Sequence, residues 1–219
     1  MSRIAITGAN RGIGLELTRQ LSARGDEVIA LVRSPSSELQ ELGVEIIAGL
    51  DMSADDLSEA SRKLGDRDLD ILINNAGILR RTGLDDLDLP SIRQQFEVNA
   101  LGPLKITSAL AKHLTSGSKV AHVTSRMGSI EDNSSGSHYG YRMSKAALNM
   151  ASKSMSVDLA GRGIAVCVLH PGYVRTDMTG RNGLIDAQES AAGLIARIDA
   201  LTLETTGGFW HQNGERLPW

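Results

Sequence analysis

The sequence contains a single cysteine, Cys167, and few aromatic residues, which make up 3% of its 219 positions. One cysteine cannot form an internal disulfide, and no spacing of cysteine and histidine resembles a zinc site, so no metal is expected. A chain of this length buries enough surface to fold without such cross-links. The scarcity of aromatics leaves aliphatic and alanine side chains to fill the core.

Long apolar runs are also missing. The longest, Val28–Val32 and Ile164–Leu169, fall far short of the ~20 residues that span a bilayer. The apolar stretch within Met1–Ile6 is too short for a signal peptide. A net charge of −3 gives no support for nucleic acid or an anionic membrane as partner. These features favour a cytoplasmic protein.

Short apolar runs alternate with segments of helical spacing along the whole chain. Most runs are continuously apolar, which is typical of parallel strands covered on both faces. The expected strands are Arg3–Thr7, Glu27–Val32, Val44–Ala48, Leu69–Ile73, Lys119–Thr124, Ile164–Leu169 and Gly208–Trp210.

Five longer segments are expected to be helices: Gly12–Arg24, Ser53–Leu64, Ser91–His113, Tyr139–Ala160 and Ala187–Leu201. The second is expected to begin at Ser53, which would cap an acidic first turn. Segments 34–37 and 133–137 read as surface loops. The alternation predicts a doubly wound α/β parallel sheet with right-handed crossovers. No repeat or proline-rich linker divides the chain, so residues 1–219 are expected to form one domain.

The first expected strand runs directly into a glycine-rich turn. Gly8, Gly12 and Gly14 lie at this junction of strand and helix, with Asn10 and Ile13 between them. Glycine permits a tight turn and a close approach of the backbone to a ligand. The free N–H groups of the following helix would face the same gap and favour an anion. The spacing differs from Gly-x-Gly-x-x-Gly, and an ordinary turn is the alternative.

The end of the second strand indicates which dinucleotide binds. A carboxylate there would hold the ribose hydroxyls of NAD, whereas an arginine accommodates the 2′-phosphate of NADP. This strand ends in Arg33, and Arg11 lies within the glycine turn. A guanidinium group suits phosphate through its planar fork. We therefore expect NADP(H) in preference to NAD(H), with two merely solvated arginines as the alternative.

Tyr141 and Lys145 are four residues apart, so they share one face of the expected helix. A phenol titrates near pH ~10, and a neighbouring ammonium lowers that pKa. The pair could therefore serve as a proton donor near neutral pH. Tyr139 has Met143 rather than lysine at this spacing. A tyrosine and a lysine also occur at this spacing by chance, so the pair needs support from other features.

Polar residues follow four of the expected strands. Ser125 follows the fifth, at the carboxyl edge where ligands bind in this architecture, and its hydroxyl could donate to a substrate oxygen. The fourth and sixth strands run into segments 74–77 and 170–177.

In this order and spacing, the motifs resemble those of the short-chain dehydrogenase/reductase family over essentially the whole chain. The matching positions are Thr7, Gly8, Gly12, Gly14, Asp51, Asn74, Asn75, Ala76, Gly77, Asn99, Ser125, Tyr141, Lys145, Pro171, Gly172, Val174 and Thr176. Residues 125–129 and the end of the chain are similar to the short carbonyl reductases and to C-factor-like signalling members. The resemblance implies a single Rossmann domain.

The resemblance also implies roles for individual residues. Tyr141 would exchange a proton with the substrate oxygen, Ser125 would polarise the carbonyl, and Lys145 would lower the Tyr141 pKa and hold the nicotinamide ribose. Asn99 would organise a water that relays protons. The remaining implied cofactor contacts are Asp51, Met52, Asn75, Ala76, Gly77, Pro171, Gly172, Val174 and Thr176.

Two departures from the family pattern bear on the substrate site. The interval between Ser125 and Tyr141 is longer than usual, which makes Ser129 a less favoured alternative to Ser125. The lid region, Met178–Gln188, is short, which predicts an open site and a broad range of carbonyl substrates.

The sequence thus predicts an NADPH-dependent oxidoreductase acting on a carbonyl or secondary alcohol, assembled as a homodimer or homotetramer. A nucleotide-binding signalling protein with little turnover is the alternative. An epimerase or dehydratase is disfavoured because 219 residues leave no room for an extra substrate domain.

Overall fold

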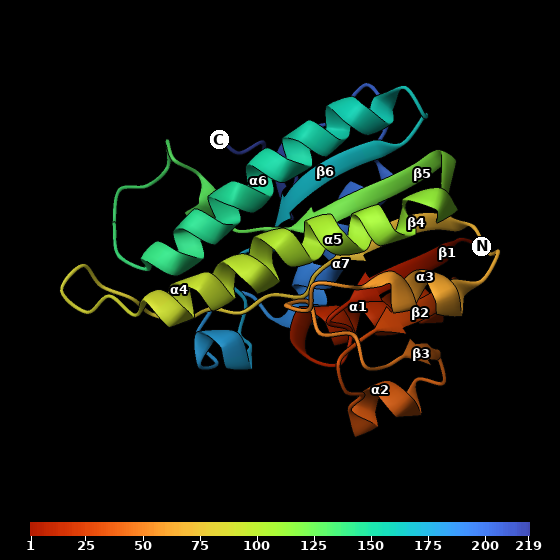
Figure 1. Cartoon of the computed structure of the whole chain (residues 1–219), viewed down its shortest axis with the longest axis horizontal. Helices are drawn as coiled ribbons and strands as arrows, with labels where there is room; N and C mark the ends of the chain where they lie inside the picture. Colours follow the sequence, from red (N-terminus) through yellow and green to blue (C-terminus); the bar gives the residue numbers. More distant parts are fainter.

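The apolar runs form the seven strands of one parallel sheet in the computed structural model, which describes residues 1–219 (Figure 1). The strand order is β3-β2-β1-β4-β5-β6-β7, and every neighbouring pair is parallel. This confirms the predicted α/β fold. The strands are β1 (Arg3–Thr7), β2 (Glu27–Leu31), β3 (Glu45–Ile47), β4 (Leu69–Asn74), β5 (Leu114–Val123), β6 (Ala165–His170) and β7 (Gly208–His211).

Helices cover both faces of the sheet, with α3, α5 and α6 in front and α1 and α7 behind in Figure 1. No helix combines the length and the hydropathy that a bilayer span requires. The α-helices are α1 (Gly12–Ala23), α2 (Ser37–Glu41), α3 (Ser58–Leu64), α4 (Leu89–Phe96), α5 (Gly102–Leu110), α6 (Tyr139–Ala160) and α7 (Ala187–Asp199). Shorter turns are η1 (Glu97–Leu101), η2 (Ala111–His113), η3 (Arg126–Gly128) and η4 (Asp177–Thr179).

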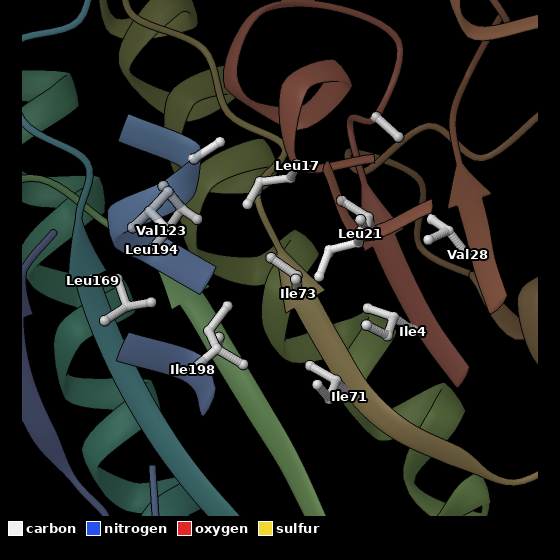
Figure 2. Close-up of a cluster of buried hydrophobic side chains, with 14 of the residues drawn as sticks. Ile4, Leu17, Leu21, Val28, Ile71, Ile73, Val123, Leu169, Leu194 and Ile198 are labelled. Carbon is white, nitrogen blue, oxygen red and sulfur yellow. The ribbon is translucent and has the colours of Figure 1, made fainter. Parts of the chain in front are cut away.

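The core consists of two hydrophobic layers, one on each face of the sheet. Successive strand residues point to opposite faces, so Ile4 and Ile6 join one layer and Ala5 the other. Leu17 of α1 and Leu194 of α7 close the first layer, which Figure 2 shows. Because both faces of each strand are buried, the continuous apolar runs seen in the sequence are what the fold requires.

The helix expected from Ser53 begins five residues later, at Ser58. The carboxylate of Asp51 accepts hydrogen bonds from both the backbone N–H and the hydroxyl of Ser53, at 2.9 and 2.7 Å, which closes a local turn. Asp56 accepts the Ser58 N–H at 2.7 Å where α3 starts. The predicted start was wrong because Ser53 donates to Asp51, two residues earlier in the chain, and does not cap a helix.

The long helix expected over Ser91–His113 is divided. It consists of α4, the π-helical turn η1, α5 and the 3₁₀ turn η2. A Cβ atom on Gly102 would lie 2.8 Å from the Met52 carbonyl oxygen, so this glycine lets α5 pack closely on the neighbouring loop. π-helical turns within α-helices are frequently found at functional sites.

Two other bounds differ from expectation. Strand β5 starts at Leu114 rather than Lys119, with an irregular register against β4 between Leu69 and Ile71. The short helix α2 was not predicted. It begins at the end of the expected 34–37 loop, where the Ser36 hydroxyl accepts the N–H of the buried Leu39 at 3.2 Å.

Strand β1 marks the point where the chain direction across the sheet reverses. Strands β2 and β3 extend to one side of β1, and β4 to β7 extend to the other. The loops that leave β1 and β4 therefore diverge at the carboxyl edge of the sheet. Such a switch point is where open α/β sheets bind their ligands.

Candidate active site

The glycine turn joins β1 to α1. Gly8 and Gly12 have φ angles of 67° and 54°, in the left-handed region that favours glycine. A Cβ atom on Gly14 would lie 2.2 Å from the Gly8 carbonyl oxygen and 2.4 Å from Nδ2 of Asn75. Each of the three glycines is therefore required by backbone conformation or by close packing.

Asn75, the residue directly after β4, holds this turn in place. Its amide Nδ2 donates to the carbonyl oxygens of Thr7 and Gly8, at 3.1 and 3.2 Å. In return, the Thr7 hydroxyl oxygen accepts the backbone N–H groups of Asn75 and Ala76, at 3.0 and 3.1 Å. The polar residues after β1 and β4 thus support one another, which the sequence did not reveal.

A cleft of about 800 Å³ opens at this edge of the sheet. Sixteen of the predicted site residues line it: Gly8, Asn10, Arg11, Gly12, Ile13, Gly14, Arg33, Asp51, Met52, Asn75, Ala76, Gly77, Tyr141, Lys145, Pro171 and Thr176. Its size lies within the range of small-molecule and cofactor sites.

Four predicted site residues do not line this cleft. Gly172 packs against Ile185, since a Cβ atom on it would lie 2.9 Å from Cδ1 of that side chain. Val174 is buried and pairs with Ile185 in an isolated bridge. Both residues therefore hold the segment that leads into the lid, and their contact with the cofactor stays a prediction. Ser125 and Asn99 are both buried, and Ser125 contacts Tyr141, which does line the cleft.

Other residues complete the lining: Leu31, Val32, Ser34, Leu50, Ser53, Ile78, Leu79, Arg80, Gln94, Val98, Val123, Thr124, Asp177 and Met178. Most of the apolar ones continue a strand or loop next to a recognised motif, so proximity in the sequence could have indicated them. Arg80 follows the Asn-Asn-Ala-Gly run by three residues but belongs to no motif.

Arg33 has a carboxylate neighbour that the sequence did not indicate. Its Nη1 lies 3.4 Å from Oδ2 of Asp51, and 77% of the Arg33 side chain is exposed. Hydrogen bonds from Ser53 are the main cause that lowers the pKa of Asp51, and Arg33 adds to the effect. The ion pair is exposed and weak, so Arg33 remains available to a phosphate. Arg11 is exposed at the start of α1.

Tyr141 and Lys145 share the buried face of α6, with 7% and 4% of their surfaces exposed. The Lys145 ammonium donates to the Val123 carbonyl oxygen at 2.9 Å and lies 5.9 Å from the centre of the Tyr141 ring. Burial lowers the pKa of Lys145 to about 8. A Cβ atom on Gly77 would lie 3.6 Å from Nζ of Lys145, so this glycine leaves space beside the ammonium.

The expected lowering of the Tyr141 pKa by Lys145 is wrong for this arrangement. Burial raises the pKa of Tyr141 to about 12, and a hydrogen bond with Ser125 acts in the opposite direction. Loss of hydration on burial is the largest cause of the shift, and the Lys145 ammonium donates to the Val123 carbonyl oxygen rather than to the phenol. The phenol is therefore protonated at neutral pH.

Of the two candidate serines, Ser125 is the one that neighbours Tyr141. Its hydroxyl oxygen also accepts the Met127 N–H at 3.1 Å. The Ser129 hydroxyl instead donates to the backbone oxygen of Trp219 at 3.0 Å and accepts the Asp132 N–H at 3.1 Å. This arrangement favours Ser125 and gives Ser129 a structural role.

Asn99 lies in the π turn η1 and is fully buried. Its Oδ1 accepts the Ile78 N–H, and its Nδ2 donates to the Ile78 carbonyl oxygen, both at 2.8 Å. The same Nδ2 donates to the Ser144 hydroxyl at 3.0 Å. The side chain is thus occupied in tying the loop after β4 to α6, and its role in a proton relay stays a prediction.

A buried polar network that the sequence did not indicate lies near Lys145. Asn74 Nδ2 approaches Nδ1 of His122 at 3.2 Å and donates to the Thr107 hydroxyl at 3.0 Å. Burial and the Lys145 charge lower the pKa of His122 to about 3, so this imidazole is neutral at pH 7. Asn74 and His122 are polar residues next to apolar runs in two strands, at paired positions of β4 and β5. This pattern was the signal in the sequence that could have indicated the network.

Comparisons with known proteins agree with this geometry. Residues 2–184 match the family described as short chain dehydrogenase. The chain is 40% identical over 226 residues to 1-hydroxy-2-glutathionyl-2-methyl-3-butene dehydrogenase of Rhodococcus sp. (strain AD45), which covers all of both chains. It is 47% identical over 154 residues to the C-signal protein of Myxococcus xanthus, which covers 69% of this chain and 93% of that protein.

Solved structures of carbonyl reductases have the same fold. The carbonyl reductase Sniffer of D. melanogaster superposes with a TM-score of 0.92 at 29% identity, over all of both chains. The NADPH-bound carbonyl reductase from chicken fatty liver gives a TM-score of 0.90 at 29% identity, over 100% of this chain and 99% of that one. With its glycine turn at a sheet switch point and a family match over most of its length, the chain belongs to the short-chain dehydrogenase/reductase family of nicotinamide-dependent oxidoreductases.

Proposed function

We propose that the protein is an NADPH-dependent reductase that interconverts a carbonyl compound and the corresponding alcohol, with Tyr141 as acid and base. The observation that carries this proposal is the position of Tyr141. The phenol is buried beside Ser125 and Lys145, on the wall of the cleft that begins at the glycine turn. A protein that only bound a nucleotide would not need a protonated phenol there.

The cleft fits a nicotinamide dinucleotide. At one end Gly8 and Gly12 open the N-terminus of α1, where a pyrophosphate would be stabilised by free N–H groups and the helix dipole. Leu31, Leu50 and Val98 offer apolar surface for an adenine ring. At the other end Lys145 would hold the nicotinamide ribose, in the space that Gly77 leaves.

We further propose a preference for NADPH over NADH, which rests on Arg33 and Arg11. Both side chains line the cleft, and both are exposed. A 2′-phosphate would replace the weak contact of Arg33 with Asp51 by a stronger guanidinium–phosphate pair. Solved carbonyl reductases with bound NADPH or NADP are consistent with this choice.

The chain's own residues would control the proton in this reaction. The bound cofactor would supply a hydride to the carbonyl carbon. Tyr141 would donate its proton to the substrate oxygen while Ser125 donates a hydrogen bond to the same atom. The ammonium of Lys145, with a pKa of about 8, is charged at neutral pH and would stabilise the phenolate left behind. In the oxidation direction, the phenolate would take the proton back.

The short lid favours a broad range of carbonyl skeletons. After Val174 the segment makes only the turn η4 and a bridge to Ile185, and Leu184 at its tip is 82% exposed. Such a lid offers few side chains to enclose a substrate. The Rhodococcus relative is named for the dehydrogenation of a hydroxylated glutathionyl compound. We therefore propose that this chain also tolerates bulky substituents beside the reacting carbon.

The decisive test is the variant Tyr141→Phe, which keeps the ring and removes the proton. NADPH oxidation with a panel of aldehydes and ketones should fall by about 10²-fold or more in kcat, because general acid catalysis is lost. NADPH binding, measured by fluorescence titration, should be retained. Tyr139→Phe is the matched control and should keep its activity. A Tyr141→Phe enzyme with a near wild-type rate would contradict the assignment.

A nucleotide-binding signalling function is the second candidate, and the 47% identity to the C-signal protein favours it. Under that function, NADP(H) would bind and no carbonyl compound of the panel would be reduced. The presence of Ser125, Tyr141 and Lys145 together favours catalysis instead, because binding alone does not require an acid.

We also propose that the chain assembles as a homodimer or homotetramer through α6 and α5. Met143, Met150 and Val157 follow one another at seven-residue spacing on α6 and are 50%, 68% and 67% exposed. Leu101 and Leu104 are exposed on the neighbouring η1 and α5. A second copy of this apolar surface would cover the first by two-fold symmetry.

A further inference from the structure

We propose that the preferred substrate carries a carboxylate, which binds Arg80 on the wall of the cleft and Arg81, the next residue of the same loop. The proposal rests on the reductase function above and adds the chemical class of the substrate. It concerns a segment that no motif of the sequence covers, residues 78–82, between β4 and α4.

Buried side chains fix the backbone of this segment. The Arg80 N–H donates to Oε1 of Gln95 at 3.0 Å, and Gln95 is fully buried in α4. The hydroxyl oxygen of Thr82, also buried, accepts the Gly140 N–H at 3.3 Å. The Arg80 backbone and the Thr82 side chain thus hold the segment on both sides of Arg81, so that it presents the two arginines from a fixed support.

The same contacts bring the segment to the reacting group. Gly140, which binds Thr82, immediately precedes Tyr141 at the start of α6. A Cβ atom on Gly140 would lie 2.6 Å from Nε2 of Gln95, so α4 and α6 pack closely at this point. Arg80 and Tyr141 line the same cleft. A substrate with its carbonyl at Tyr141 would extend its far end toward Arg80 and Arg81.

Some charged side chains along the cleft have an ion-pair partner in the protein, and others have none. Its lining contains two carboxylates, Asp51 and Asp177, which pair with Arg33 and Arg181. Arg80, in contrast, lies within 4 Å of no carboxylate.

Arg81 is likewise exposed and without an ion pair. The nearest acidic residues in the sequence are Asp85, Asp86 and Asp88, and the last of these caps α4 through the Ser91 N–H. Arg80, which lines the cleft with Tyr141, and the neighbouring Arg81 are therefore two cationic side chains that no protein carboxylate neutralises.

Further cationic groups lie around His138, at the turn before α6. Burial and the nearby charges of Arg81 and Arg142 lower the pKa of His138. Arg142 itself donates to the carbonyl oxygens of Gly136 and Ser137, at 2.9 and 3.2 Å, and is thereby occupied. Arg81 is left to meet an external anion. A planar carboxylate suits the fork of a guanidinium group.

The test compares 4-formylbenzoate with its methyl ester, which has the same aldehyde and ring but no charge. We measure kcat/KM for both with NADPH, in the wild type, Arg80→Gln and Arg81→Gln. The ratio of acid to ester should fall by about tenfold in each variant, because one charge-assisted contact is lost. In the wild type, 0.5 M NaCl should lower the ratio as well, since salt screens exposed charges.

Arg62→Gln is the matched control, because it removes the same charge from an exposed position on α3 that does not line the cleft. It should leave the ratio unchanged. Ratios that stay within twofold of the wild type in both Arg80→Gln and Arg81→Gln would overturn the inference. In that case reduction of the ester would still support the reductase function, so the two proposals fail separately.

A second readout does not depend on turnover. The unfolding midpoint of the NADP⁺-loaded protein is measured with each compound present. The acid should raise the midpoint more than the ester in the wild type, and this difference should shrink in Arg80→Gln and Arg81→Gln. Equal midpoints with acid and ester in the wild type would also contradict an anion site.

Discussion

Arg33 and Asp51 lie opposite one another where we propose that the adenosine ribose binds, and their balance should set the cofactor preference. Arg33→Asp would place a second carboxylate next to Asp51, where it would repel a 2′-phosphate and accept ribose hydroxyls. We expect the ratio of kcat/KM for NADPH to that for NADH to fall by at least about tenfold. Steady-state kinetics with both cofactors measures this ratio directly.

The same charge reversal at Arg19, on the exposed side of α1 and outside the cleft, is the control for this experiment. It should leave the ratio as it is. If Arg33→Asp also keeps the wild-type ratio, Arg33 does not contact the phosphate.

At the level of single residues, the sequence predicted where site residues lie in the fold better than it predicted their pKa values and their ion-pair partners. Tyr141 and Lys145 share a face of a helix because they are four residues apart, and local spacing is enough to predict that. The pKa of Tyr141 depends on how much water surrounds the ring, which is set by elements far away in the sequence. The Asp51 partner of Arg33 was missed for the same reason, since eighteen residues separate the two.

Among the elements, the junction of β1 and α1 is the most sensitive to added volume. Gly14→Ala would place a methyl group 2.2 Å from the Gly8 carbonyl oxygen, where the backbone must move to admit it. We expect a loss of about 1–3 kcal/mol in the free energy of unfolding. NADPH should also bind more weakly, because the turn that we propose holds the pyrophosphate is displaced. Urea unfolding and cofactor titration measure the two effects.

Gly161→Ala is the matched control for Gly14→Ala. Gly161 has a right-handed backbone conformation at the end of α6, and a Cβ atom there would meet nothing within 4 Å. Its replacement should leave stability unchanged or slightly higher, because alanine restricts the unfolded chain. Equal effects of the two substitutions would show that the glycine turn tolerates side chains.

The strands and α6 were predicted because their signals are local: continuous apolar runs, and apolar residues at helical spacing. The π turn η1 was not, because its cause is a set of contacts across the fold. Asn99 within it binds Ile78, and Gly102 after it packs on Met52. The late start of α3 likewise depends on how the Asp51 side chain is used. Sequence patterns predict which residues are buried, but they do not predict which distant residues a side chain will bind or contact.

At the scale of the whole molecule, the apolar stripe of α6 predicts assembly. Met150 is the most exposed of its three residues, so Met150→Glu would place a charge in the middle of the proposed interface. Light scattering coupled to size-exclusion chromatography should give twice or four times the 23.4 kDa of one chain for the wild type. The variant should give the mass of a single chain.

Leu203→Glu changes an exposed leucine in the loop after α7, away from the stripe, and should leave the mass of the assembly unaltered. A wild-type mass of one chain would contradict the proposed interface, and so would an assembly that persists in Met150→Glu.

The bond from the Asn75 side chain to the glycine turn has a consequence for the order of events during synthesis. The turn is complete in sequence by residue 14, but the amide that braces it comes 67 and 68 residues after Gly8 and Thr7. A ribosome that adds roughly 5–20 residues per second needs several seconds to cover that interval. The nascent chain therefore carries the glycine turn, our proposed phosphate site, before it has the Asn75 side chain that holds the turn in shape. Nucleotide can protect the growing protein only after β4 has emerged and paired with β1.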